Sequence, residues 1–329
     1  MNKQELENEE VRQEEKKTKK KKVRKKKTMF GHIRSIISIL LVVGIIGGSY
    51  WYYAFQYRAE VEPETNRKVT NTDSVYTMEQ YLKTLKRNQT VYKYACAEAE
   101  VDNDYGTYVV PGLKSTRTLK VKGDGEAEVC TSMTPQGLAF TEDYILVSAY
   151  CKTKAHDSVI YVIDKESRRF VKEIVLNTKA HVGGMAYDTM NQILWVTGQG
   201  STWAQANAIT LSHLENYSFD DGYHPIEFDM SYNLYKIKRA SFMTYHDGAL
   251  FVGFFTQDNA SVIEKYLINA DGTLYEKEDM NLKRTVGVTE PVAYAVSMQV
   301  ISGKVQGMAF YNNKILLTRS WGILPSEVQ

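Results

Sequence analysis

Apolar residues follow two different patterns along this chain, and each pattern predicts a different kind of element. Residues 33–55 read IRSIISILLVVGIIGGSYWYYAF, and residues 37–48 within them carry no charge. A helix needs about 20 mostly apolar residues to span a bilayer, and the aromatic residues 51–53 come where an interfacial belt would lie. This stretch therefore predicts a transmembrane helix at residues 33–55.

The second pattern begins near residue 96 and consists of short apolar runs separated by turns. Four segments share one design, QGLAF at 136–140, GGMAY at 183–187, SFMTY at 241–245 and QGMAF at 306–310. Each precedes a second apolar run, at 144–149, 193–197, 249–255 and 314–318, and the first unit adds runs at 158–164 and 169–176. Four consecutive antiparallel strands make one propeller blade, so the pattern predicts an all-β fold with a β-propeller at residues 96–329.

The spacing of these units is uneven, and the last unit is too short to supply a complete blade for a closed propeller ring. Gly137, Gly184, Phe242 and Gly307 begin the units, with steps of 47, 58 and 65 residues. Blades of this class take about 40 to 50 residues, so we expect loop insertions, at residues 203–206 and 220–224. The last unit ends after its second strand. Either strands near 107–110 and 116–121 complete the last blade, or the propeller is truncated at Gln329.

Charge is concentrated at the N-terminus, although the whole chain carries only +2. Residues 1–30 hold an acidic stretch and then the run KKTKKKKVRKKK at 16–27. Basic flanks stay in the cytoplasm, so we expect a cytoplasmic tail at 1–30, a single-pass signal anchor, and a C-terminal domain outside the cell. A cleaved signal peptide is the alternative. No aromatic residues interleave the lysines, so we expect no nucleic-acid partner.

Residues 56–95 are predicted to link the membrane helix to the propeller. Their first part is polar, and Met78, Tyr81, Leu82 and Leu85 then recur at helical spacing. This pattern predicts a solvated linker followed by a short stalk helix.

The first unit carries a family resemblance. Residues 145–188, ILVSAYCKTKAHDSVIYVIDKESRRFVKEIVLNTKAHVGGMAYD, resemble the YVTN-type β-propeller repeat of YncE-like and surface-layer proteins. The second and fourth units match it in their inner strands, and the third departs further, with Phe242 where the others have Gly. The resemblance implies a propeller related to NHL and quinoprotein-like propellers. That set includes binding scaffolds, lyases and dehydrogenases, so the resemblance selects no reaction.

The loops that enter the inner strands surround one mouth of a propeller, and their polar residues are the candidate ligand-binding site. Two equivalent positions form this ring, with Thr134, His181, Arg239 and Lys304 at the first and Gln136, Ser241 and Gln306 at the second. Such a partly cationic ring could bind an anionic group through charge-assisted hydrogen bonds. The alternative is that these side chains satisfy loop backbone groups.

Three cysteines lie on the expected outer side, where oxidation is permitted. Cys130 and Cys151 flank one predicted hairpin, so we expect a disulfide between them, with Cys96 as an alternative partner. The sequence has no C-x-x-C motif, and we expect no metal site.

Strong catalytic motifs are absent from the sequence, which contains no G-x-S-x-G, H-E-x-x-H or P-loop series. We therefore expect a membrane-anchored extracellular module that binds a small anion, a glycan or a surface protein, without a cofactor. The alternative is an extracellular hydrolase or lyase acting on a small anionic or sugar-like substrate, with His181 as its base. A quinone-dependent redox enzyme is a third option, for which no cofactor-specific residues are evident.

Overall fold

The computed structural model describes most of the chain. The described residues are 3–57, 115–121, 123, 125–167, 169–276, 290–312, 314–322 and 326–329, with single residues at 83, 86, 87, 89, 92, 93 and 113. The chain divides into two compact units, Met1–Glu60 and Val61–Gln329. The predicted linker and stalk helix, the strand near 107–110 and Cys96 lie largely or wholly outside the described residues.

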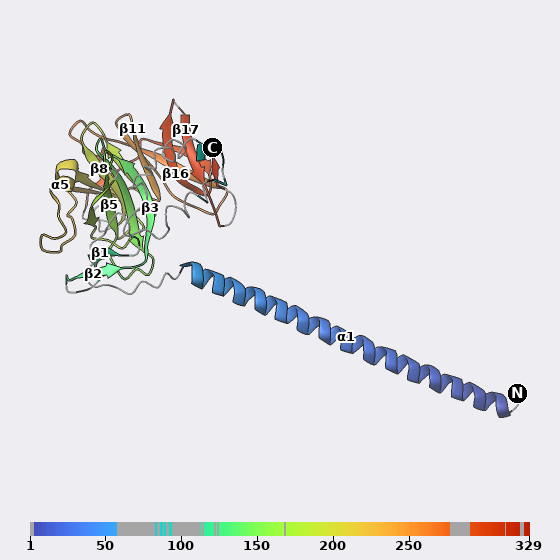
Figure 1. Ribbon diagram of the computed structural model, residues 1–329. Helices are drawn as coiled ribbons and strands as arrows, with labels where there is room; N and C mark the ends of the chain where they lie inside the picture. Colours follow the sequence, from blue (N-terminus) through green and yellow to red (C-terminus); the bar gives the residue numbers. More distant parts are fainter. Residues whose placement is uncertain are drawn as a thin grey trace. The chain divides into compact units, whose positions relative to one another are not determined.

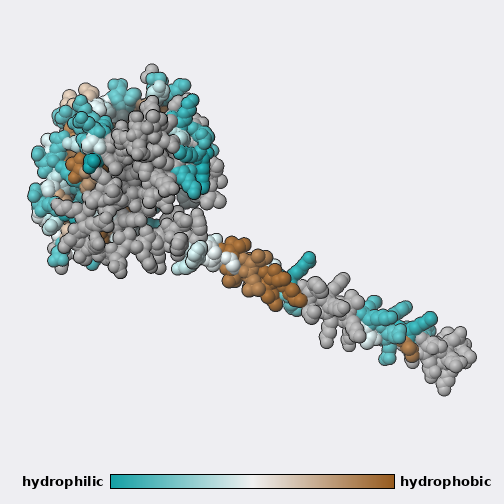
Figure 2. Space-filling view, in the orientation of Figure 1, coloured by the Kyte–Doolittle hydropathy of each residue, from teal (hydrophilic) through white to brown (hydrophobic). Residues whose placement is uncertain are grey.

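The first unit is one helix, α1 (Lys3–Tyr57), of 55 residues. It extends through the charged tail, where lysine, glutamate, glutamine and arginine are all good helix formers. Its segment Gly31–Trp51 has a mean hydropathy of 1.9 and no buried side chains, and Figure 2 shows it as a continuous hydrophobic band. Among the described residues it is the one helix long and apolar enough to cross a membrane. Its length and composition fit a membrane anchor or a signal sequence.

The second unit is mostly β and has a propeller-like arrangement of four sheets, here called blades 1 to 4 (Figure 1). Blade 1 contains β3 (Met133–Phe140), β4 (Tyr144–Cys151), β5 (Val159–Asp164) and β6 (Phe170–Val175). Blade 2 contains β7 (Met185–Asp188), β8 (Ile193–Gln199), β9 (Ala204–Thr210), β10 (Met230–Leu234) and β14 (Val292–Ala293). Blade 3 contains β11 (Phe242–His246), β12 (Ala249–Gly253), β13 (Ala260–Leu267) and β15 (Ser297–Ser302). Blade 4 contains β16 (Val305–Tyr311), β17 (Lys314–Arg319) and β18 (Glu327–Val328).

The predicted inner hairpins are confirmed in all four units, because β3 pairs with β4, β7 with β8, β11 with β12 and β16 with β17, each antiparallel. The third and fourth strands of the first unit are confirmed as β5 and β6. Successive first strands lie side by side, β3 with β7, β7 with β11 and β11 with β16.

Two details of the prediction were wrong. Residues 116–121 do not complete the last blade. Instead β1 (Thr116–Leu119) pairs with β2 (Ala127–Cys130) and lies against blade 1, where Arg117 forms an ion pair with Glu173 of β6 at 3.1 Å. Residues 203–206 are not an insertion, since β9 begins at Ala204. Residues 220–224 do lie in a long connection, which follows α5 (Leu211–Asn216).

The large spacing of the third unit has a topological cause. The chain leaves β13, adds β14 parallel to β10 at the edge of blade 2, and then returns as β15 to pair with β13. The third unit therefore contains an inserted strand, β14, that belongs to the sheet of blade 2.

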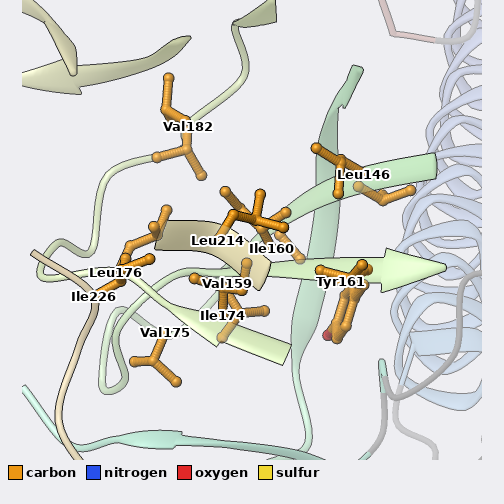
Figure 3. Packing of buried hydrophobic residues seen from close by; sticks show 14 of the residues in the cluster. Leu146, Val159, Ile160, Tyr161, Ile174, Val175, Leu176, Val182, Leu214 and Ile226 are labelled. Carbon is orange, nitrogen blue, oxygen red and sulfur yellow. The ribbon is translucent and has the colours of Figure 1, made fainter. Parts of the chain in front are cut away.

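The largest hydrophobic cluster lies around blade 1 (Figure 3). Residues 159–163 of β5 are at most 2% exposed, so both faces of this strand are buried. This explains why the strand reads as a continuous apolar run instead of alternating. Leu214 of α5 and Ile226 of the following connection pack into the same cluster.

Candidate functional site

The first strands of blades 1, 2 and 3 begin close together at one end of the propeller. A Cβ atom added to Gly183 would lie 2.5 Å from the carbonyl oxygen of Ser241, and one added to Gly137 would lie 2.9 Å from that of Gly183. In each blade the second strand runs back to this end, so the loop that leaves it lies there too. The structure thus gathers the strand-entering loops on one face.

Part of the predicted polar ring meets around Tyr150. Thr134 lies opposite Tyr150 in the β3–β4 register, and the imidazole of His181 stacks on the Tyr150 ring at 3.9 Å between centroids, with an interplanar angle of 16°. Gln136 is exposed, and its amide donates a hydrogen bond to the carbonyl of Pro135 at 2.8 Å. The loop that enters blade 2 therefore contacts the inner hairpin of blade 1 through His181 and Tyr150.

The other ring residues lie where the chain enters blades 3 and 4. Arg239 is exposed, and the backbone N–H of Ser241 donates to the carbonyl of Gly253. Lys304 adopts a positive φ of 65°, and the amide of Gln306 donates to the carbonyl of Ser320 at 3.3 Å. A ligand-binding role for these residues stays a prediction.

His181 is held mainly as neutral imidazole. Partial burial is the larger cause that lowers its pKa, and the nearby positive charge of Lys154 lowers it further. A neutral imidazole at neutral pH can accept a proton or a hydrogen bond.

Charge separates the two ends of the propeller. The loops at the strand-entering end, residues 152–158, 176–184, 200–203, 235–241, 254–259 and 303–304, contain seven basic and two acidic residues, and are called the basic face below. The described turns at the opposite end, residues 141–143, 165–167, 169, 189–192, 247–248, 268–276 and 312, contain six acidic and two basic residues. A surface of one sign attracts ligands of the other.

An apolar groove of about 670 Å³ lies on blade 1. Leu138, Phe140 and Ile145 line it, and Gln136 and Lys165 are its polar lining residues. The side chains of Leu138 and Phe140 are 54% and 52% exposed. Nothing in the described residues indicates what would cover it.

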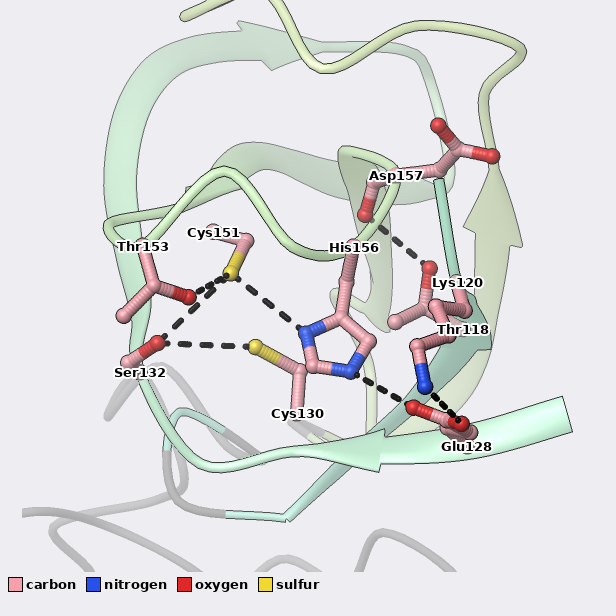
Figure 4. Close-up of polar contacts among 9 residues, drawn as sticks. All are labelled: Thr118, Lys120, Glu128, Cys130, Ser132, Cys151, Thr153, His156 and Asp157. Carbon is pink, nitrogen blue, oxygen red and sulfur yellow. Dashed lines mark hydrogen bonds and ion pairs between the residues drawn. The ribbon is translucent and has the colours of Figure 1, made fainter. Parts of the chain in front are cut away.

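Two cysteines and one histidine meet at the edge of the basic face (Figure 4). Cys130 ends β2, Cys151 ends β4, and His156 lies in the loop between β4 and β5. The structure brings the two sulfurs together as expected, but as free buried thiols instead of the predicted disulfide. His156 Nδ1 lies 3.5 Å from Cys151 Sγ, a contact that the sequence interpretation missed. The spacing C-x4-H from Cys151 to His156 was the available signal.

The two thiols have opposite tendencies to ionise. Burial raises the pKa of Cys130 to about 12. Burial also opposes ionisation of Cys151, but hydrogen bonds from Thr153, His156 and Ser132 outweigh it and lower its pKa to about 5. Cys151 is therefore the more readily ionised of the two thiols.

No protein-family model matches the chain, and no curated protein matches it. Among solved structures, it is similar to hydrazine synthase of Kuenenia stuttgartiensis, with 15% identity over 63% of this chain and 49% of that chain and a TM-score of 0.36. It is similar to glutaminyl cyclase of Myxococcus xanthus, with 12% identity over 62% of this chain and 75% of that chain and a TM-score of 0.35.

A third similar structure is a putative oxidoreductase (glucose dehydrogenase) of Thermus thermophilus, with 9% identity over 67% of this chain and 91% of that chain and a TM-score of 0.31. The chain spans about half the length of the hydrazine synthase chain. The YVTN-type resemblance stays a prediction, and the propeller-like arrangement follows from the strand pairing of the chain itself.

Proposed function

We propose that this protein is a membrane-anchored binding module that holds an anionic ligand on its basic face, outside the cell. The observation that carries the proposal is the separation of charge between the two ends of the propeller. Seven basic residues lie in the loops of one end, and acidic residues prevail in the turns of the other.

The N-terminal helix supports the anchored part of the proposal. Its apolar segment Gly31–Trp51 is long enough to cross a bilayer, and the lysine run at 16–27 precedes it. Basic segments of this kind are retained in the cytoplasm, which would place the propeller on the other side.

The ligand chemistry follows from the side chains at the basic face. Lys154, Lys238 and Arg239 are exposed there and can donate charge-assisted hydrogen bonds to carboxylates or sulfates. The stacked rings of Tyr150 and His181 offer a flat surface beside Lys154. A carboxylated sugar, which has both an anionic group and an apolar ring face, would use both features.

The test is calorimetric titration of the full chain in detergent with oligogalacturonate. We expect Lys238→Glu with Arg239→Glu to weaken binding by about tenfold or more, because two attractive charges become repulsive. Arg169→Glu with Lys314→Glu changes the net charge equally at the opposite end and should leave affinity within about twofold. Equal losses in both double variants, or no binding by the unaltered chain, would contradict the proposal.

One observation favours the enzyme alternative, a hydrolase or lyase with His181 as base. The lowered pKa of His181 leaves its imidazole able to accept a proton near neutral pH. If this alternative holds, His181→Ala abolishes turnover of a bound sugar acid while calorimetric binding persists. The binding module instead shows no turnover with either chain.

A further inference from the structure

The cluster at the edge of the basic face has the donor set of a metal site. The Sγ atoms of Cys130 and Cys151 and one ring nitrogen of His156 all lie within 4.8 Å of one another. Three separate segments supply these atoms, namely the end of β2, the end of β4 and the β4–β5 loop (Figure 4). Sulfur and imidazole donors together suit zinc and other thiophilic ions better than magnesium or calcium.

The distances between the donor atoms fit tetrahedral coordination of one metal ion if the donors move slightly closer together. Zinc–sulfur bonds of about 2.3 Å and zinc–nitrogen bonds of about 2.0 Å place sulfur and nitrogen ligands about 3.5 Å apart. The separation between Cys151 Sγ and His156 Nδ1 is 3.5 Å. The third donor, Cys130 Sγ, lies within the 4.8 Å limit and must move closer to the other two donors by about 1.3 Å at most.

Neighbouring side chains already orient the histidine as an outer-shell partner would. His156 Nε2 lies 3.2 Å from Glu128 Oε2, which leaves Nδ1 directed at Cys151. Lys120 Nζ in turn binds Glu128 Oε1 at 3.2 Å. Metal-ligating histidines commonly engage a carboxylate through their second nitrogen, which fixes the ring orientation.

The loop that carries His156 is itself anchored to β1. The N–H of Val121 donates to the carbonyl of Ala155, and the N–H of Asp157 donates to the carbonyl of Leu119, both at 2.9 Å. The hydroxyl of Thr118 donates to the carbonyl of Asp157 at 2.9 Å. The histidine therefore keeps its place without an ion.

Hydroxyl groups and burial complete the surroundings of the sulfurs. Ser132 Oγ lies 3.7 Å from Cys130 Sγ and 3.6 Å from Cys151 Sγ, and Thr153 Oγ1 lies 3.0 Å from Cys151 Sγ. Cys130 is 0% and Cys151 is 1% exposed, whereas the His156 side chain is 15% exposed. A small fourth ligand would have to enter past His156.

We propose that Cys130, Cys151 and His156 bind one thiophilic divalent metal ion of the zinc class, with Glu128 as the outer-shell partner of His156. Binding joins the metal to both sulfurs and releases the remaining thiol protons, with no change of oxidation state. The same two sulfurs cannot bind metal while joined in a disulfide, so the two states exclude each other.

The test uses the full chain in detergent, reduced and free of metal, titrated with Co²⁺ alone and then with Zn²⁺ as competitor. We expect one equivalent of Co²⁺ to produce a sulfur-to-cobalt charge-transfer band that Zn²⁺ abolishes. Cys130→Ser, Cys151→Ser and His156→Gln should each weaken or remove this band. Glu128→Gln should weaken affinity by about 10- to 100-fold. His213→Gln is the matched control and should leave the titration unchanged.

A second measurement does not depend on the folding of variants. In the unaltered chain, Zn²⁺ should protect Cys130 and Cys151 from alkylation, as mapped by mass spectrometry. The proposal is overturned if the reduced chain gives no charge-transfer band or no protection, or if His213→Gln removes the band. A chain isolated without reductant that carries the Cys130–Cys151 disulfide, and whose reduced form binds no metal, overturns it equally.

Discussion

The hydroxyl of Ser148 joins the first two blades. It accepts a hydrogen bond from the N–H of Gly137 at 2.8 Å and donates one to the carbonyl of Val182 at 2.7 Å. Ser148 is 0% exposed, so neither backbone group can turn to solvent for a substitute. One buried side chain therefore bonds both to blade 1 and to the loop that enters blade 2.

We expect Ser148→Ala to lower the free energy of unfolding by roughly 1–3 kcal/mol, because it leaves a buried donor and a buried acceptor unpaired. Urea unfolding followed by tryptophan fluorescence measures this difference. Ser201→Ala at an exposed position is the control and should change stability by less than about 0.5 kcal/mol. Equal effects would show that the hydroxyl does not join the blades.

The protonation of His181 can be tested directly. Burial and then the charge of Lys154 lower its pKa, so the folded chain binds this proton less readily than the unfolded chain. The contribution of His181 to stability is therefore lost as the pH falls below its ordinary value of about 6.5. In NMR titrations of labelled histidine, Lys154→Gln should raise the pKa of His181. Lys179→Gln should leave it unchanged, and a pKa unaffected by Lys154→Gln would contradict the electrostatic cause.

At the scale of elements, three of the four blades place a glycine at the start of the first inner strand opposite a serine or threonine hydroxyl on the second inner strand. Gly137 lies against Ser148, Gly184 against Thr197 and Gly307 against Thr318. Blade 3 reverses the sizes, since Phe242 lies opposite Gly253 in the β11–β12 register. The departure at Phe242 is thus compensated by a glycine where the other blades have a hydroxyl.

This reversal makes Gly253 intolerant of a side chain. A Cβ atom there would lie 2.2 Å from Cζ of Phe242, which is 2% exposed. We expect Gly253→Ala to cost about 1–3 kcal/mol of unfolding free energy through overpacking. Gly307→Ala is the matched control in blade 4, where the nearest atom, Thr318 Oγ1, would be 3.0 Å away, and its cost in the same denaturation assay should be smaller. If Gly307→Ala lowered the free energy of unfolding more than Gly253→Ala, the proposed packing of Phe242 against Gly253 would be contradicted.

At the scale of the whole molecule, we expect the apolar segment of α1 to hold the chain in a membrane. Leu41→Arg with Val42→Arg should shift the chain from the carbonate-resistant membrane fraction to the soluble fraction, because each arginine at a helix centre opposes insertion by about 3 kcal/mol. Val11→Arg, outside the apolar segment of the same helix, should have no such effect. A soluble unaltered chain whose mass lacks the first residues would instead indicate a cleaved signal sequence.

The sequence by itself determined the features that rest on local periodicity. The apolar segment of α1 and the eight inner strands are each encoded in a few consecutive residues, so their patterns could be read without knowing any neighbour. The outer strands β5 and β6 were also predictable, because β5 is buried on both faces and reads as an apolar run, and β6 ends in the buried apolar residues Ile174 and Val175.

Only the tertiary structure decided which distant segments meet. β14 joins blade 2 from within the third unit, and β1 lies against blade 1, through pairings that no local pattern encodes. His156 faces Cys151 because hydrogen bonds between its loop and the segment at residues 118–121 fix where the ring lies. Local patterns specify strands, whereas the chemistry at the edge of the basic face depends on contacts between residues up to 39 positions apart.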